Sequence, residues 1–244
     1  MAAADSGDSP QAYARLAGVL YLVIIIAGAL GELCIRGKLV IAGDPAATAG
    51  RIMASESLWR LGIAGDLAMH VCDVFVMWAL YVLLRPVNRD LALLNLLLNL
   101  VQTAVLVANK SLLLMPLFLL GDAAYLKAFD AEQLQAWSYL AIRLHEHGFG
   151  IGLVFFGFVC LVEGYLIRKS RYLPALIGGL MQLAGACYLV NSAALLLAPA
   201  LAARLFPAIM LPCLVAELSL AAWLTFKGVK REAWLERQRT LVAS

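Results

Sequence analysis

The chain has 244 residues, of which 63% are hydrophobic and only 14% are charged. An ordinary soluble domain carries about 25% charged residues, so this composition excludes a soluble globular protein and predicts an integral membrane protein. The net charge of +3 is small, and the basic residues gather at the ends of apolar runs. This indicates orientation in a bilayer, so we expect membrane lipids, and no nucleic acid, as partners.

Six apolar runs are long enough to cross a bilayer, which needs about 20 residues per helix. In chain order they cover residues 13–34, 58–84, 91–119, 136–167, 174–198 and 206–227. We therefore predict an all-α polytopic membrane helical bundle of six transmembrane helices, forming one membrane domain over residues 1–244. The stretch MAAADSGDSPQAYAR is not basic as a cleavable signal peptide would be, so we expect the first run to be retained as a helix.

The loop after the first run is predicted to contain a short helix. Asp44 followed by Pro45 is the pattern of a helix N-cap with proline at the first helical position. The apolar residues that can share one side of the following segment are Ile52, Met53, Leu58 and Trp59. This pattern favours a short interfacial helix in the first outer loop, at the membrane surface, with a lid over a site as the alternative.

Basic residues mark one end of the predicted bundle. They follow the even-numbered runs, at Arg85, Arg89, Arg168, Lys169, Arg171, Lys227, Lys230 and Arg231. The positive-inside rule assigns this end to the cytoplasm, so we expect both the N- and the C-terminus to be cytoplasmic. The first loop is the exception, because it carries Arg36, Lys38 and Arg51 on the other side.

A polar stripe runs along the second span. Asp66, His70 and Asp73 follow i, i+4, i+7 spacing and therefore share one helix face. Counted from Leu84 at about 1.5 Å per residue, Asp73 lies about 16 Å deep, near the middle of a core about 30 Å thick. An isolated charge at that depth costs roughly 2.5–3.5 kcal/mol, so the stripe is predicted to face the bundle interior.

Counted in the same way, polar residues of the third, fifth and sixth spans form two layers. The middle layer holds Asn99, Gln102, Gln182 and Glu217, and the outer layer holds Lys110 and Asn191. The stretch RLHEHGFG lies at the outer interface, because the apolar block 148–167 can span the bilayer alone. We predict a polar cavity that opens outward and is closed toward the cytoplasm. Its expected lining residues are Asp66, His70, Asp73, Asn99, Gln102, Lys110, Arg143, Glu146, His147 and Glu217.

The pattern favours binding or transport of a small polar or amphipathic solute, with protonatable groups available to link it to protons. We expect no metal and no cofactor. His145 and His147 point about 200° apart on a helix, so at most one of them faces the cavity. Catalytic signatures such as GxSxG and HExxH are absent from the sequence. An intramembrane enzyme acting on a lipid or small molecule, and a purely structural or accessory bundle, stay open as alternatives.

Four stretches carry a resemblance to a known family through their order and spacing. They are ARLAGVLYLV, GDPAATAGRIMASESLWRLGIAGDL, ALYVLLRPVNRDLALLNLLLNLV and GLVFFGFVCLVEGYLIRKSRYLPALIGGLMQLAGACYLVNS, which together extend over nearly the whole chain. The chain resembles the bacterial multi-pass membrane proteins catalogued as domain of unknown function 4386. The resemblance implies a helical bundle in the bacterial inner membrane, and it supplies no activity, cofactor or catalytic residue.

Overall fold

The fold is all-helical. It was obtained as a computed structural model, which describes residues 9–243, and these residues contain helices and connecting turns without strands. The interpretation of residues 1–8 as something other than a signal peptide lies outside the described residues. Six helical segments are long and apolar enough to cross a membrane: Pro10–Leu39, Glu56–Leu84, Arg89–Leu119, Ala131–Ser170, Ala175–Leu197 and Ala208–Phe226. The predicted all-α polytopic bundle is therefore confirmed.

Three of these segments change helix type along their length. The first contains α1 (Pro10–Leu30), the π-helix η1 (Gly31–Arg36) and α2 (Gly37–Leu39). The third contains α5 (Arg89–Asn109), the 3₁₀-helix η2 (Lys110–Leu113) and α6 (Met115–Leu119), and the sixth contains η4 (Ala208–Met210) and α10 (Leu211–Phe226). The others are single helices: α4 (Glu56–Leu84), α7 (Ala131–Ser170) and α8 (Ala175–Leu197). The connecting helices are α3 (Pro45–Ala54), η3 (Ala124–Ala128), α9 (Pro199–Leu205) and α11 (Arg231–Ala243).

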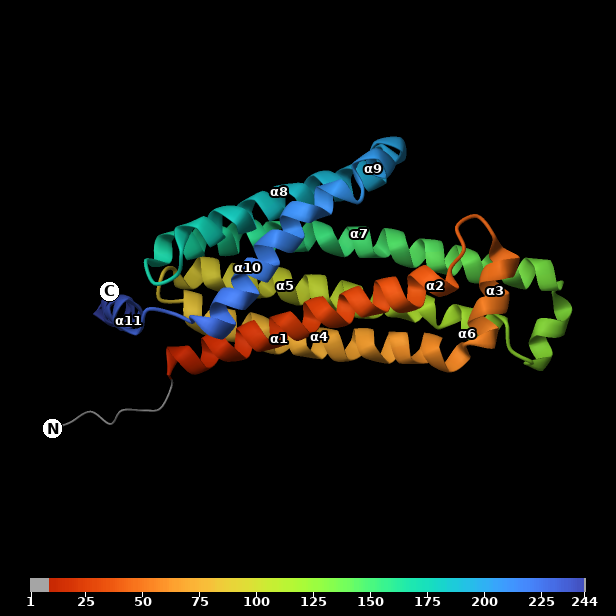
Figure 1. Ribbon diagram of the computed structural model, residues 1–244, viewed down its shortest axis with the longest axis horizontal. Coiled ribbons are helices and arrows are strands. Elements are labelled where there is room, and N and C mark those ends of the chain that lie inside the picture. The colour runs from red at the N-terminus through yellow and green to blue at the C-terminus, as the bar shows by residue number, and fades with distance from the viewer. Residues whose placement is uncertain (1–8, 244) are drawn as a thin grey trace.

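The long helices run back and forth between two ends of the molecule (Figure 1). We call the end that carries both termini and α11 the terminal end, and the end that carries α3 and η3 the distal end. Helix α7 packs along α8 and α5, and α1 packs along α4 and α10. Large apolar side chains cover the outside, among them Leu176, Leu197 and Phe226, as expected for surfaces in contact with lipid.

Glycines set the close approach of α7 and α8. A Cβ added to Gly185 of α8 would lie 2.6 Å from the carbonyl oxygen of Gly157 of α7. Gly164 of α7 and Gly178 of α8 face each other in the same way. Small residues at such spacing let two backbones meet directly, which is how helices pack where no water drives them together. This contact orients Glu163, the neighbour of Gly164, toward the interior of the bundle, where it is buried.

Helix α3 begins where the sequence predicted. The Asp44 side chain accepts a hydrogen bond from the backbone N–H of Ala47 at 2.9 Å, and the helix lies at the distal end (Figure 1). Ile52 and Trp59 are buried together, whereas Met53 and Leu58 are exposed. The prediction that all four share one side is wrong, because the helix is interrupted at Ser55, where the backbone leaves helical geometry before α4 begins.

Helix α11 was not predicted, and it closes the terminal end. The Trp234 indole N–H donates to the carbonyl oxygen of Leu83 at 3.0 Å, and the Tyr172 hydroxyl donates to the same oxygen at 2.6 Å. Burial raises the pKa of the Tyr172 phenol well above its ordinary range, so this hydroxyl remains protonated and able to donate. Two donors thereby satisfy a carbonyl near the end of α4 that has no partner within its own helix.

Candidate functional site

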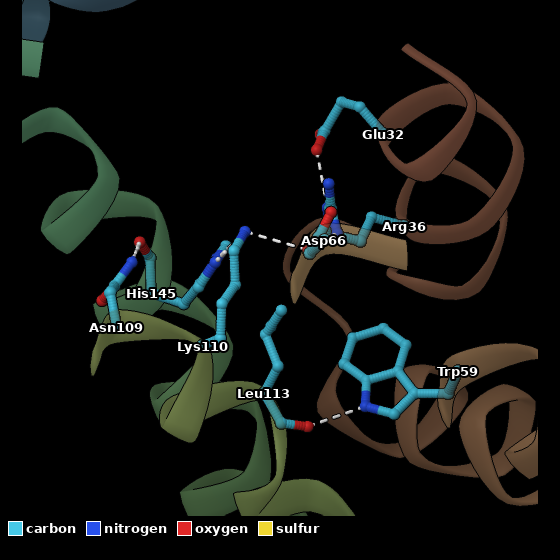
Figure 2. A network of polar contacts seen from close by, with 8 residues as sticks. All are labelled: Glu32, Arg36, Trp59, Asp66, Asn109, Lys110, Leu113 and His145. Carbon is cyan, nitrogen blue, oxygen red and sulfur yellow. Dashed lines mark hydrogen bonds and ion pairs between the residues drawn. The ribbon is translucent and has the colours of Figure 1, made fainter. Parts of the chain in front are cut away.

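Four buried or half-buried side chains near the distal end form a connected set, which we call the distal ion network: Arg36, Asp66, Lys110 and His145. The Asp66 carboxylate on α4 accepts from Lys110 Nζ at 2.9 Å and from an Arg36 guanidinium nitrogen at 2.8 Å. Figure 2 shows Lys110 lying between His145 and Asp66, with Arg36 on the far side of the carboxylate. The network therefore joins four segments of the bundle: η1, α4, η2 and α7.

Arg36 comes from a segment that the sequence analysis had placed in a loop outside the membrane. The π-helix η1 continues the first span, and Arg36 at its last position reaches Asp66 while also pairing with Glu32 at 2.7 Å. Single π-helical turns are frequently found at functional sites. With Glu32 included, two cations face two carboxylates, so the set is balanced in charge.

The contact between Lys110 and His145 fixes the state of the histidine ring. Lys110 Nζ lies 3.3 Å from His145 Nε2, and an ammonium group can only donate, so Nε2 must be the unprotonated, accepting nitrogen. Asn109 donates to the carbonyl oxygen of His145 at 2.8 Å. Gly148 makes room for this amide, because a Cβ at position 148 would overlap the Asn109 side chain.

His147 does not take the place that the sequence analysis gave it. Its Nδ1 contacts the carbonyl oxygen of Arg143 at 2.9 Å, and the Arg143 side chain pairs with Glu146 on the exposed side of α7. The structure thus corrects the expected lining residues Arg143, Glu146 and His147. The expectation that at most one of the two neighbouring histidines faces inward is met, and the inward residue is His145, because it shares the α5-facing side of α7 with Gly148.

The distal end is closed in this conformation, whereas the sequence analysis predicted an outward-open cavity. Asp66, Lys110 and His145 are only 3%, 4% and 5% exposed. Arg36 and Lys110 both cover the Asp66 carboxylate, since each lies within ion-pair distance of it. His70, one turn along α4, is also buried, and its Nε2 has no hydrogen-bond partner among the described residues.

A second group of ionisable side chains lies nearer the terminal end. Each of them is about 10–20 Å from the terminal end of its own helix, counted at the α-helical rise per residue. We call Asp73, Glu163 and Glu217 the central carboxyl cluster. Glu163 is buried on α7 and within electrostatic range of both other carboxyls. Asp73 on α4 and Glu217 on α10 are half-buried and within electrostatic range of each other.

Neutral donors surround the central carboxyl cluster. Glu217 accepts hydrogen bonds from the hydroxyls of Tyr188 and Tyr21. Asp73 accepts from the Thr103 hydroxyl and from the Asn99 amide, and Gln102 is buried beside Thr103. The expected residues Asn99 and Gln102 are therefore next to Asp73.

No cation balances these carboxyls within residues 9–243. None of the ion pairs formed by the described residues involves Asp73, Glu163 or Glu217. One oxygen of Glu163, Oε1, has no hydrogen-bond partner in this part of the chain. The described residues also hold no group of three or more His, Cys, Asp or Glu side chains arranged to bind a metal ion. Chemically, the cluster can exchange protons between carboxyls and hydroxyls.

The sequence analysis did not name Glu163, Tyr21 or Tyr188. Residues 148–167 were interpreted as one apolar block, and Glu163, the one acidic residue within it, was not considered as a site residue. The signal that could have found Glu163 is its position four residues inside the end of that block, next to a glycine of the α7–α8 contact. For the two tyrosines the sequence offers no comparable signal, because a tyrosine in a span is usually an interfacial anchor.

Comparisons with known proteins were made for the whole chain. The sequence model described as "Domain of unknown function (DUF4386)" matches residues 16–228. An uncharacterized protein of Archaeoglobus fulgidus is 27% identical over 130 residues, which cover 53% of this chain and 64% of that relative. The matched region thus spans less than two thirds of the relative's length. No solved structure shows a significant match.

Proposed function

The chain belongs to the DUF4386 family, and we propose that it binds or transports a small polar or amphipathic solute across the bacterial inner membrane, linked to protons on the central carboxyl cluster. One observation carries the proposal: Glu163 is buried with one unpaired oxygen, within electrostatic range of the half-buried Asp73 and Glu217, and none of the three pairs with a cation among the described residues. Carboxyls that share an apolar interior cannot all be ionised at low cost, so such a group takes up protons or a cation.

The distal ion network supplies the closing element of this proposal. In alternating access, a central site opens to one side of the membrane at a time. Asp66 holds Arg36 and Lys110 together over the distal side of the cluster, so outward opening requires these ion pairs to separate. The basic residues at the terminal end favour a cytoplasmic position for that end and for both termini.

Proton binding by the cluster is tested on the purified full chain by difference infrared spectroscopy across a pH step. We expect carboxylic acid C=O bands that shrink as the pH rises. The band of Glu163 should be absent in Glu163→Gln, and the band of Glu217 should be absent in Glu217→Gln. Glu146→Gln is the matched control, because Glu146 is exposed and paired outside the cluster. Identical difference spectra for the wild type and all three variants would overturn the proposed role of the cluster.

Solute linkage is tested in proteoliposomes that hold a pH-sensitive dye inside. An imposed pH gradient is followed during additions of small amines, amino acids and amphipathic amides. We expect at least one class to dissipate the gradient in the wild type and in Glu146→Gln, with a rate about tenfold lower in Glu163→Gln. Another outcome would be that none of these solutes dissipates the gradient faster in wild-type vesicles than in empty ones, although the infrared bands are present. That result would support proton binding by the cluster and would contradict transport of these solute classes.

A further inference from the structure

A cavity of about 250 Å³ lies at the terminal end, between the end of α7 and the helix α11. Its lining residues are Arg171, Ala233, Glu236, Arg237 and Thr240. None of these residues belongs to the central carboxyl cluster or to the distal ion network. The cavity therefore needs an explanation separate from the proposed transport.

The two arginines of the cavity come from well-defined positions of the backbone. Arg171 ends α7 in the left-handed conformation, with φ of 65°, which is uncommon for a residue with a side chain. Arg237 donates from Nη2 to the carbonyl oxygen of Lys169 at 3.1 Å, which uses one of its five N–H groups. Trp234 ties α11 to α4, so the two guanidinium groups are brought together from elements that are fixed to one another.

The surroundings of the cavity are strongly basic. Exposed cations on the same two segments are Arg168, Lys169, Lys230, Arg231 and Arg239, against the acids Glu232 and Glu236. Summed charge of one sign draws anions to a surface. The planar guanidinium fork matches the oxygens of a phosphate group in a bidentate manner.

We propose that this cavity binds a phosphate group. Orientation in the membrane needs only positive charge near the helix ends, and it does not need two arginines lining one cavity. The cavity lies just beyond Ser170 and Phe226, where two spans end and lipid headgroups are expected. The phosphate can therefore belong to an anionic phospholipid of the adjoining leaflet or to a small phosphorylated molecule in solution.

The test uses the full chain in detergent, with native mass spectrometry to count bound phosphatidylglycerol and calorimetry with glycerol phosphate. We expect one retained lipid, with affinity reduced about tenfold in Arg171→Gln, which corresponds to the loss of one charge-assisted contact. Glu236→Gln should bind more tightly, because it removes the one negative charge that lines the cavity. Arg204→Gln, an exposed arginine at the distal end, is the matched control and should leave binding unchanged.

The two probes separate the sources of the phosphate. Retention of phosphatidylglycerol without binding of glycerol phosphate supports a lipid headgroup site, and tight binding of glycerol phosphate supports a soluble ligand. Equal lipid retention together with equal glycerol phosphate binding in the wild type, Arg171→Gln and Glu236→Gln would overturn the proposal. Since Arg237 also anchors α11, Arg237→Gln serves only as a secondary variant, and the opposite signs expected for Arg171→Gln and Glu236→Gln do not depend on folding.

Discussion

The distal ion network and the central carboxyl cluster lie in the same bundle and solve the burial of charge in opposite ways. In the network, Asp66 has two cations within 2.9 Å, and the set spans four helical segments. In the cluster, Asp73 and Glu217 accept from hydroxyl groups, Glu163 has one oxygen without a partner, and none of the three pairs with a cation among the described residues. The first arrangement resists change, because separating any partner leaves a buried charge uncompensated, whereas the second is able to gain and lose protons.

The same contrast separates a structural role from a proton-binding role among residues of one helix face. Asp66 and Asp73 lie two turns apart on α4, yet one is locked in ion pairs and the other accepts only neutral hydrogen bonds. If a residue has a structural role, its mutation should lower the stability of the protein. If it has a proton-binding role, its mutation should leave the stability unchanged and remove the function. Substitutions in the two regions can therefore break or sharpen the comparison.

The largest effect is expected for Asp66→Asn. The variant leaves Lys110 buried without a counter-charge and leaves Arg36 with Glu32 alone, which should lower the free energy of unfolding by about 3–5 kcal/mol. Asp73→Asn is the matched control, and it should stay within about 1 kcal/mol of the wild type, because an amide can still accept from Thr103. Thermal unfolding in detergent measures both. Equal losses for the two variants would remove the distinction between the regions.

An intermediate effect is expected for Gly164→Ala, beside the central carboxyl cluster. The new Cβ would lie 2.9 Å from the backbone nitrogen of Gln182, and backbone cannot give way, so we expect a loss of about 1–3 kcal/mol. Gly148→Ala, in the distal region, meets the movable side chain of Asn109 and should lose less. Gly179→Ala has open space around it and serves as the control. A Gly148→Ala loss larger than that of Gly164→Ala would contradict this ranking.

The smallest effect is expected for Tyr172→Phe at the terminal end. It removes one of two donors to Leu83, with a loss of about 1 kcal/mol at neutral pH. The folded-state pKa of Tyr172 is raised, so its contribution is fully present below an ordinary tyrosine pKa of about 10 and falls as the pH rises above it. Unfolding measured from pH 8 upward should therefore show the wild type approaching Tyr172→Phe. A constant gap between them at every pH would contradict the assignment.

Sequence reasoning reached the bundle and part of the interior, and it failed at identifiable places. Periodicity along α4 placed Asp66, His70 and Asp73 on one face turned away from lipid, and in the structure Asp66 and His70 are buried and Asp73 is half-buried. The same reasoning chose His147 rather than His145, and it was wrong because the choice depends on which side of α7 meets α5. Arg36 was missed because hydropathy alone does not show that a helix continues through a π-turn beyond the apolar run.

The sequence by itself determined the class, the six spans and the basic end of this protein, because apolar length and charge placement act locally along the chain. Only the tertiary structure decided which polar residues meet. Asp66 acquires two cations and Glu163 acquires none through helices that are distant in sequence. Those partnerships follow from how helices rotate and approach one another, and glycines such as Gly148 and Gly164 control that approach through contacts that no local pattern encodes.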